Sequence, residues 1–90
     1  MDNFEVLLMP QALKFYKACP EELATKLNKC FEDLENNPFW GQNIKVLKGE
    51  KKRYRYRIAT YRVIYSVDKD KRKVIVTLIA PRASAYRNIN

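Results

Sequence analysis

Histidine is absent from this chain of 90 residues. Its absence excludes Ser–His and Cys–His nucleophilic systems, and every acid–base pair that is built on imidazole. Any catalysis by this protein must therefore depend on arginine, lysine, tyrosine or carboxylate side chains.

Long apolar segments are also missing. The longest apolar runs, such as Val74–Ala80, are far below the roughly 20 residues that span a bilayer. The N-terminal stretch MDNFEVLLMPQ is acidic at its start, and its apolar run is too short for a signal peptide. We therefore expect a cytoplasmic protein that does not associate with a membrane.

Cysteine is scarce, with Cys19 and Cys30 as the two examples. Their spacing matches no zinc-binding pattern, and the sequence has no acidic cluster that would hold a hard cation. Both residues fall on the apolar faces of expected helices, so we interpret them as reduced, buried structural thiols. No metal or cofactor is predicted.

Positive charge, by contrast, is abundant. The formal net charge is +8, while 47% of the residues are hydrophobic and 31% are charged. This composition is typical of a folded protein, and the length corresponds to one domain over residues 1–90. A field of this sign favours phosphate polymers, acidic proteins or anionic membranes as partners.

The order of the expected elements is β-α-α-β-β-β. A strand is predicted at Phe4–Leu8, followed by a helix from Pro10, a second helix from Pro20 to the Asn36-Asn37-Pro38 run, and strands at Tyr54–Ile58, Tyr61–Val67 and Val74–Ala80. Helices followed by a three-stranded antiparallel meander indicate an α+β fold. The helical hairpin should cover one face of the sheet and leave the other face open.

Residues 38–49 show few regular signals and are expected to be a connection. We expect Phe39 and Trp40 to pack beneath the core. The alternative is an exposed aromatic platform.

The run KKRYRYRIATYRVIY, at residues 51–65, combines six basic residues with four tyrosines and no acid. Because side chains alternate across a strand, Arg55 and Arg57 should project from the open face, while the tyrosines between them face the helices. The short turn brings Arg62 next to Arg57. Arg82 and Tyr86 follow the last strand, so the tail can return over the same face. Guanidinium groups match phosphate, because their planar fork binds two oxygens at once.

Other interpretations of these residues remain open. Lys51, Lys52 and Arg53, at the rim, are equally well explained as solvated charges that block edge-to-edge aggregation. Arg62 has an alternative partner in the carboxylate of Glu5. The hairpin tyrosines are better explained by core packing than by base stacking.

Several segments together resemble the RelE/ParE toxin superfamily of bacterial toxin–antitoxin systems. They are LKG at 47–49, YRYRI at 54–58, TYRVIYSV at 60–67, VIVTLIA at 74–80 and PRASAYR at 81–87. The resemblance implies one of two activities. RelE-like members cleave mRNA in the ribosomal A site, whereas ParE-like members act on DNA gyrase.

The resemblance to RelE-like enzymes implies a catalytic set at Arg55, Arg57, Arg62, Arg82 and Tyr86. The chain departs from the best-known relatives at the first two positions, where they carry lysines. It also has Ala80 or Pro81 where many relatives have a histidine near the end of the last strand. Further contacts with RNA are expected from Lys48, Lys51, Lys52, Arg53 and Arg87.

The reaction expected from this set is attack of an RNA 2′-OH on its own 3′ phosphodiester, without a metal. Tyr86 is the best candidate for the base, since neighbouring arginines would lower its pKa from the ordinary value of about 10. Arg55, Arg57 and Arg62 would stabilise the developing charge. By resemblance Arg82 is the leaving-group acid, although its high pKa makes a charge clamp more reasonable.

The expected partners are the ribosome, mRNA and an acidic antitoxin protein that covers the site. Two other functions compete with this hypothesis. They are inhibition of DNA gyrase by protein binding, and RNA binding without catalysis.

Overall fold

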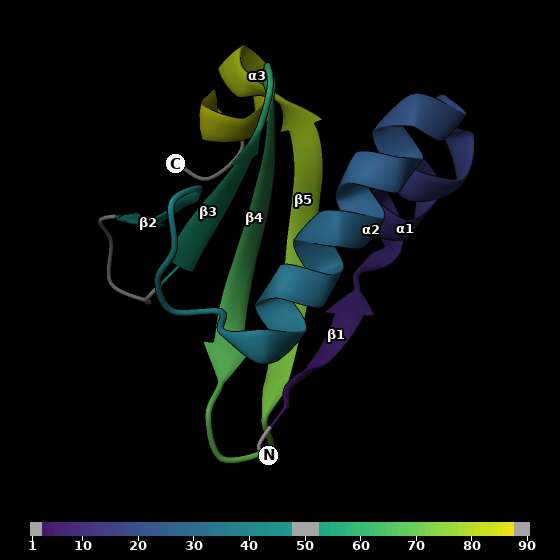
Figure 1. Cartoon of the computed structure of the whole chain (residues 1–90). Helices are drawn as coiled ribbons and strands as arrows, with labels where there is room; N and C mark the ends of the chain where they lie inside the picture. Colours follow the sequence, from purple (N-terminus) through teal and green to yellow (C-terminus); the bar gives the residue numbers. More distant parts are fainter. Residues whose placement is uncertain (1–2, 48–52, 88–90) are drawn as a thin grey trace.

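The computed structural model describes residues 3–47 and 53–87, and the side chains within these ranges except those of residues 86 and 87. The elements follow the predicted order, with two additions, β2 and α3 (Figure 1). They are β1 (Glu5–Leu8), α1 (Pro10–Ala18), α2 (Glu21–Asn36), β2 (Ile44–Leu47), β3 (Arg53–Ile58), β4 (Tyr61–Asp68), β5 (Lys73–Pro81) and α3 (Arg82–Arg87). The α+β class is confirmed.

The five strands form one sheet in the order β1-β5-β4-β3-β2. Strands β2 to β5 are antiparallel neighbours, whereas β1 lies parallel to β5 at the far edge. The two helices between β1 and β2 make this parallel arrangement possible, because a parallel pair needs a crossover rather than a tight turn.

The helix boundaries follow from local sequence. Pro10 occupies the first turn of α1, where its missing N–H costs no hydrogen bond. Glu21 and Glu22 lie in the first turn of α2, where the helix dipole favours negative charge. Both helices lie on the same side of the sheet (Figure 1).

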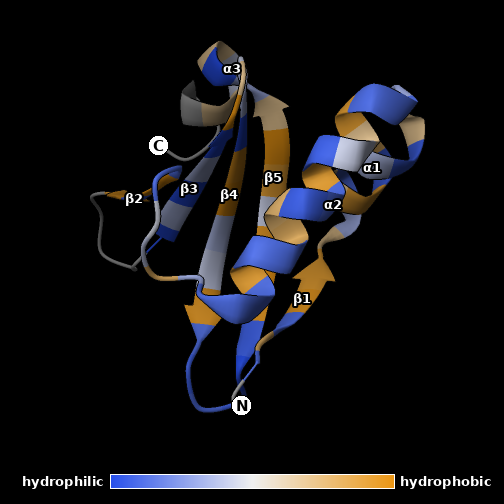
Figure 2. Cartoon of the chain, viewed as in Figure 1, coloured by the Kyte–Doolittle hydropathy of each residue, from blue (hydrophilic) through white to orange (hydrophobic). Residues whose placement is uncertain are grey.

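The main core lies between this helical layer and the sheet. Leu27, Cys30 and Leu34 of α2 are fully buried against apolar residues of β3, β4 and β5. In Figure 2 hydrophobic residues recur along α2, β1 and β5, while the β4–β5 turn is hydrophilic throughout. The prediction of buried thiols is confirmed for Cys30, and Cys19 is half-buried; neither cysteine is in a disulfide.

A second, smaller cluster lies on the opposite face of the sheet. Ala85 of α3 is buried against Ile64 and Ala80, with Leu47 and Leu78 packed around them. The prediction that no helix covers this face is therefore wrong in part. The C-terminal segment does return over the face as expected, but it forms a short helix that covers one end.

The aromatic predictions divide between right and wrong. Tyr54, Tyr56 and Tyr65 belong to the main core, as expected. Phe39 also packs against that core. The prediction for Trp40 is wrong, because its side chain is 74% exposed.

Candidate functional site

A hollow of about 460 Å³ opens on the sheet face opposite α1 and α2. The side chains around it come from β2, β3, β4 and the start of α3. The described residues that line it are Lys45, Leu47, Arg55, Arg57, Arg62 and Arg82. Four of the five predicted catalytic residues therefore meet at one place. We call this feature the basic hollow.

Arg62 is the most deeply placed of these cations. The residue is only 8% exposed, and its Nη1 donates hydrogen bonds to the carbonyl oxygens of Ala59 (3.2 Å) and Tyr61 (2.9 Å). Ala59 lies in the β3–β4 turn with φ of 51°, a conformation that is uncommon for any residue except glycine. Arg62 thus stabilises the turn and is itself held in place by it. Because its guanidinium is anchored, little ordering is needed when an anion binds.

Arg55 and Arg57 project from β3 onto the same face. The burial pattern of β3 alternates between its arginines and its buried tyrosines, as predicted. Arg55 Nη1 donates to the carbonyl oxygen of Asn43 at 2.9 Å, and the backbone N–H of Arg57 donates to the same oxygen at 2.9 Å. Arg57 lies directly opposite Arg62 in the register of β3 and β4.

Arg82 begins α3, and its backbone N–H donates to the carbonyl oxygen of Thr60 at 2.8 Å. This bond joins the start of α3 to the β3–β4 turn and brings the Arg82 side chain to the hollow. The alternative pairing of Arg62 with Glu5 is wrong. Glu5 forms a salt bridge with Lys73 at 2.8 Å. Arg62 lies opposite Ala80 on β5, which is seven residues beyond Lys73 and therefore roughly 20 Å away from it.

The remaining predicted residues are not all described. Tyr86 and Arg87 belong to α3, which packs on this face through Ala85, but their side chains lie outside the described set. Arg53 begins β3 with an exposed side chain outside the lining of the hollow. The expected RNA contacts Lys48, Lys51 and Lys52 lie outside the described residues.

Lys45 was not predicted from the sequence. It follows Ile44 on β2 and lies opposite Arg55 in the β2–β3 register, so it adds another cation to the basic hollow. Ile-Lys-Val-Leu has no regular alternation of polar and apolar residues, so the sequence offered no clear signal for this strand.

The electrostatic character of the basic hollow is one-sided. Five of its six described lining residues are cationic, and none is acidic. Like charges this close repel one another, so the arrangement favours binding of an anion that accepts several hydrogen bonds. A phosphodiester in a strained or pentacoordinate geometry has that property.

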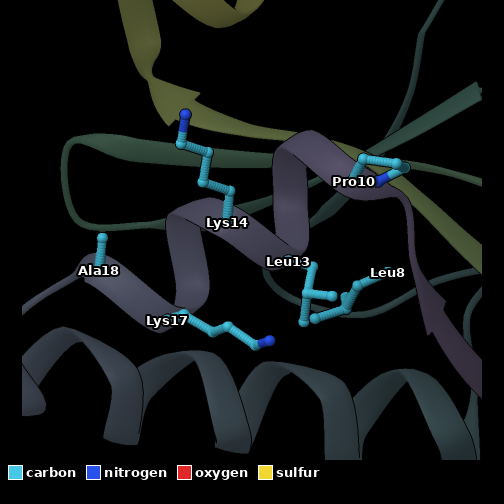
Figure 3. A pocket seen from close by; sticks show the side chains of 6 residues that line it. All are labelled: Leu8, Pro10, Leu13, Lys14, Lys17 and Ala18. Carbon is cyan, nitrogen blue, oxygen red and sulfur yellow. The ribbon is translucent and has the colours of Figure 1, made fainter.

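A second groove, of about 570 Å³, runs along the outer side of α1. In Figure 3 the side chains of Leu8 and Leu13 lie together, with Lys17 directed toward the same space. Lys14 also lines the groove, with its side chain directed away from the two leucines. Leu13 is 39% exposed and the adjacent Met9 is 46% exposed. Apolar surface beside lysines is typical of a protein-binding site.

Within residues 3–47 and 53–87, no helix has both the length and the apolar character of a membrane span. In the same ranges, cysteine, aspartate and glutamate side chains form no group of three that would hold a metal ion.

Comparison with known proteins identifies the family. A profile described as "ParE toxin of type II toxin-antitoxin system, parDE" matches residues 6–86. The putative toxin RelE1 of Methanocaldococcus jannaschii is 37% identical over 88 residues, which cover 96% of this chain and 98% of that protein.

Solved structures give the same result for the fold. The chain is similar to one in the archaeal RelE–RelB complex from Pyrococcus horikoshii OT3, with a TM-score of 0.78, 25% identity, and coverage of 89% of this chain and 96% of that one. It is also similar to a chain of the intact E. coli RelBE toxin–antitoxin complex, with a TM-score of 0.76, 22% identity, and coverage of 87% and 95%. This protein therefore belongs to the RelE/ParE toxin superfamily and is a RelE-like toxin of a type II toxin–antitoxin system.

Proposed function

We propose that this toxin is a ribosome-dependent endoribonuclease that cleaves mRNA in the ribosomal A site and thereby stops translation. The observation that supports this proposal most strongly is the convergence of Arg55, Arg57, Arg62 and Arg82 on one hollow without an acidic residue among its described lining. Such a site would act in the cytoplasm, where the ribosomes are.

The proposed reaction is an in-line displacement at phosphorus. The 2′-oxygen loses its proton and bonds to the adjacent phosphorus, while the bond from phosphorus to the 5′-oxygen breaks and that oxygen gains a proton. The products are a 2′,3′-cyclic phosphate and a 5′-hydroxyl. Preorganised cations that face the developing negative charge contribute the largest share of such catalysis, and the anchored Arg62 is well suited to this role.

Within this proposal the other residues have distinct roles. Arg55 and Arg57 bind the non-bridging phosphate oxygens from β3. Arg82 neutralises charge on the leaving oxygen, and Tyr86 accepts the proton of the 2′-OH or orients that group. Because this acid–base set is weak, we expect slow cleavage of free RNA. The ribosome would align the mRNA, and alignment alone contributes roughly 7–11 kcal/mol.

The direct test uses purified ribosomes that carry a defined mRNA. The wild-type toxin should cut the A-site codon, while Arg62→Ala and Arg82→Ala should lower the rate at least about 100-fold. Lys26→Ala is the matched control, because it removes one exposed charge from α2, on the other side of the sheet. Wild-type rates in both hollow variants would show that the site is misassigned.

Inhibition of DNA gyrase is the second candidate, because the matching profile is that of ParE toxins. In this case purified toxin would block supercoiling by gyrase and leave ribosome-bound mRNA intact. Both reactions are to be measured with the same preparation.

We further propose that an acidic antitoxin neutralises this toxin. The similar RelE chains of Pyrococcus horikoshii and E. coli were crystallised in complexes with RelB. The α1 groove fits an acidic amphipathic segment, since Leu8 and Leu13 offer apolar surface and Lys14 and Lys17 offer positive charge.

This docking site is tested by calorimetric titration with the cognate antitoxin. The double variant Lys14→Glu and Lys17→Glu should bind at least tenfold more weakly, whereas Lys26→Glu should bind like the wild type. Equal affinities for all three proteins would contradict docking at α1.

A further inference from the structure

Trp40 is the single tryptophan of the chain and lies between α2 and β2. Its side chain is 74% exposed, although the neighbouring Phe39 packs into the main core. The two rings are tilted by 44° with centroids 6.4 Å apart, so contact with Phe39 leaves most of the indole accessible. An accessible indole of this kind offers a surface for stacking.

A groove of about 470 Å³ adjoins this indole. We call it the Trp40 groove. Its described lining is rich in amides and contains one cation and one carboxylate; the residues are Lys29, Asp33, Asn36, Asn37, Trp40, Gly41, Gln42, Asn43, Ile44 and Tyr56. A primary amide both donates and accepts hydrogen bonds, as the edge of a nucleobase requires.

Some of these polar groups are fixed in position. Asn37 Oδ1 accepts from the backbone N–H of Phe39 at 3.0 Å, and Asn36 Nδ2 donates to the carbonyl oxygen of Glu32 at 3.0 Å. Each amide still has capacity for another hydrogen bond, because it has two N–H groups and an oxygen with two lone pairs.

The charges of the groove compensate each other. The Asp33 carboxylate accepts hydrogen bonds from Lys29 Nζ (2.8 Å) and Tyr56 Oη (2.6 Å). Burial raises the pKa of Asp33, but these two hydrogen bonds and the positive charge of Lys29 together outweigh burial and hold the pKa below its ordinary value. The carboxylate is therefore ionised at neutral pH and balances the lysine, so the groove suits a neutral base better than a phosphate.

The Trp40 groove and the basic hollow lie on either side of the edge strand β2. The side chain of Asn43 lines the groove, while its carbonyl oxygen binds the Arg55 guanidinium of the hollow at 2.9 Å. On the edge strand β2, Ile44 lines the groove and the next residue, Lys45, lines the hollow. A single strand of RNA that crosses β2 would thus have its phosphates near Lys45 and a base near Trp40.

We propose that the Trp40 groove is a subsite for one unpaired RNA base that flanks the cleaved link. The base stacks on the Trp40 indole, and the surrounding amides bind its edge. This inference rests on the proposed ribonuclease function. RNA is favoured over a protein ligand because the groove adjoins, across β2, a basic hollow whose described lining is almost entirely cationic.

The single tryptophan makes the test direct. The toxin is titrated with a short single-stranded 2′-O-methyl RNA, which has no 2′-OH and cannot be cleaved. Stacking should quench the intrinsic fluorescence in a saturable manner. In parallel, the anisotropy of the labelled RNA should show binding by Trp40→Ala that is weaker by roughly fivefold or more. Trp40→Phe should recover part of the affinity.

Val46→Ala is the matched control, because Val46 is 54% exposed on β2 but does not line the groove. It should bind like the wild type. Unchanged fluorescence during saturable binding, or wild-type affinity in Trp40→Ala, would overturn the subsite. A fluorescence response to the antitoxin but not to RNA would also overturn it and would identify a protein contact.

The two hypotheses fail separately. Cleavage of ribosome-bound mRNA without quenching by RNA refutes the subsite and leaves the ribonuclease intact. Saturable quenching by the 2′-O-methyl RNA, without cleavage of ribosome-bound mRNA, supports base binding and refutes the ribonuclease.

Discussion

Arg57→Gln should make the toxin more stable and less active. Arg57 lies directly opposite Arg62, and both line the basic hollow together with Arg55 and Arg82. A directly opposed pair of like charges lowers the free energy of unfolding by about 0.2–1 kcal/mol. Repulsion from Arg55 and Arg82 lowers it further. Glutamine keeps the aliphatic stem and removes the charge. We therefore expect a gain of about 1 kcal/mol in the free energy of unfolding at low salt.

For a domain of this size, a gain of about 1 kcal/mol corresponds to a rise in Tm of about 4–8 °C. The gain should vanish in 1 M salt, where the Debye length is about 3 Å. Cleavage of ribosome-bound mRNA should fall about 10²- to 10³-fold. The assay is thermal unfolding at low and high salt, with Lys26→Gln on α2 as the control for net charge.

The result that would refute this reasoning is a loss of stability in Arg57→Gln, or a gain that persists in 1 M salt. Either result would mean that the arginines of the hollow do not repel one another, and that no electrostatic repulsion is present for a bound anion to relieve.

Three further predictions concern the core and the groove beside it. Tyr65→Phe removes the buried hydrogen bond to the carbonyl oxygen of Pro38 (2.7 Å), and it should cost about 1–2 kcal/mol in urea unfolding; an unchanged midpoint would contradict the bond. Burial raises the pKa of the Cys30 thiol, so a disulfide reagent at neutral pH should modify only the half-buried Cys19 as long as the protein is folded. Rapid modification of both cysteines in the folded protein would be inconsistent with this core. The folded pKa of Asp33 lies below its ordinary value of 3.8, so the stabilising effect of its carboxylate is present at neutral pH and is lost as the pH falls through the folded pKa. Asp33→Asn should therefore be less stable than the wild type at pH 7, and the stabilities of the two proteins should converge in acid. A difference in stability that stays constant with pH would exclude this linkage.

The arginine face of the site could be predicted because β3 alternates strictly between large polar and large apolar residues. Its tyrosines have a core to enter, so its arginines must lie on the other face. The short β3–β4 turn then fixed the position of Arg62 without further information. Arg82 was placed from its position just after the last strand, and the resemblance added its catalytic role. The hydrogen bond that brings it to the hollow is a contact between distant parts of the chain.

The elements that were missed carry weak local signals. Strand β2 lies at the edge of the sheet. Of its two residues that line the hollow, Lys45 is polar and Leu47 is apolar, so the strand shows no clear alternation of polar and apolar residues. Helix α3 has six residues, too few for a helical period to be recognised. The exposure of Trp40 was missed because apolar composition predicts burial, whereas this small core is already occupied by Phe39 at that position.

Mapping the 5′ ends of cellular mRNA after brief induction of the toxin tests the central claim most directly. The account predicts 5′-hydroxyl ends that are in phase with codons in cells expressing the wild type, and no such ends in cells expressing Arg62→Ala. Intact mRNA together with blocked DNA supercoiling in growth-arrested cells would contradict it.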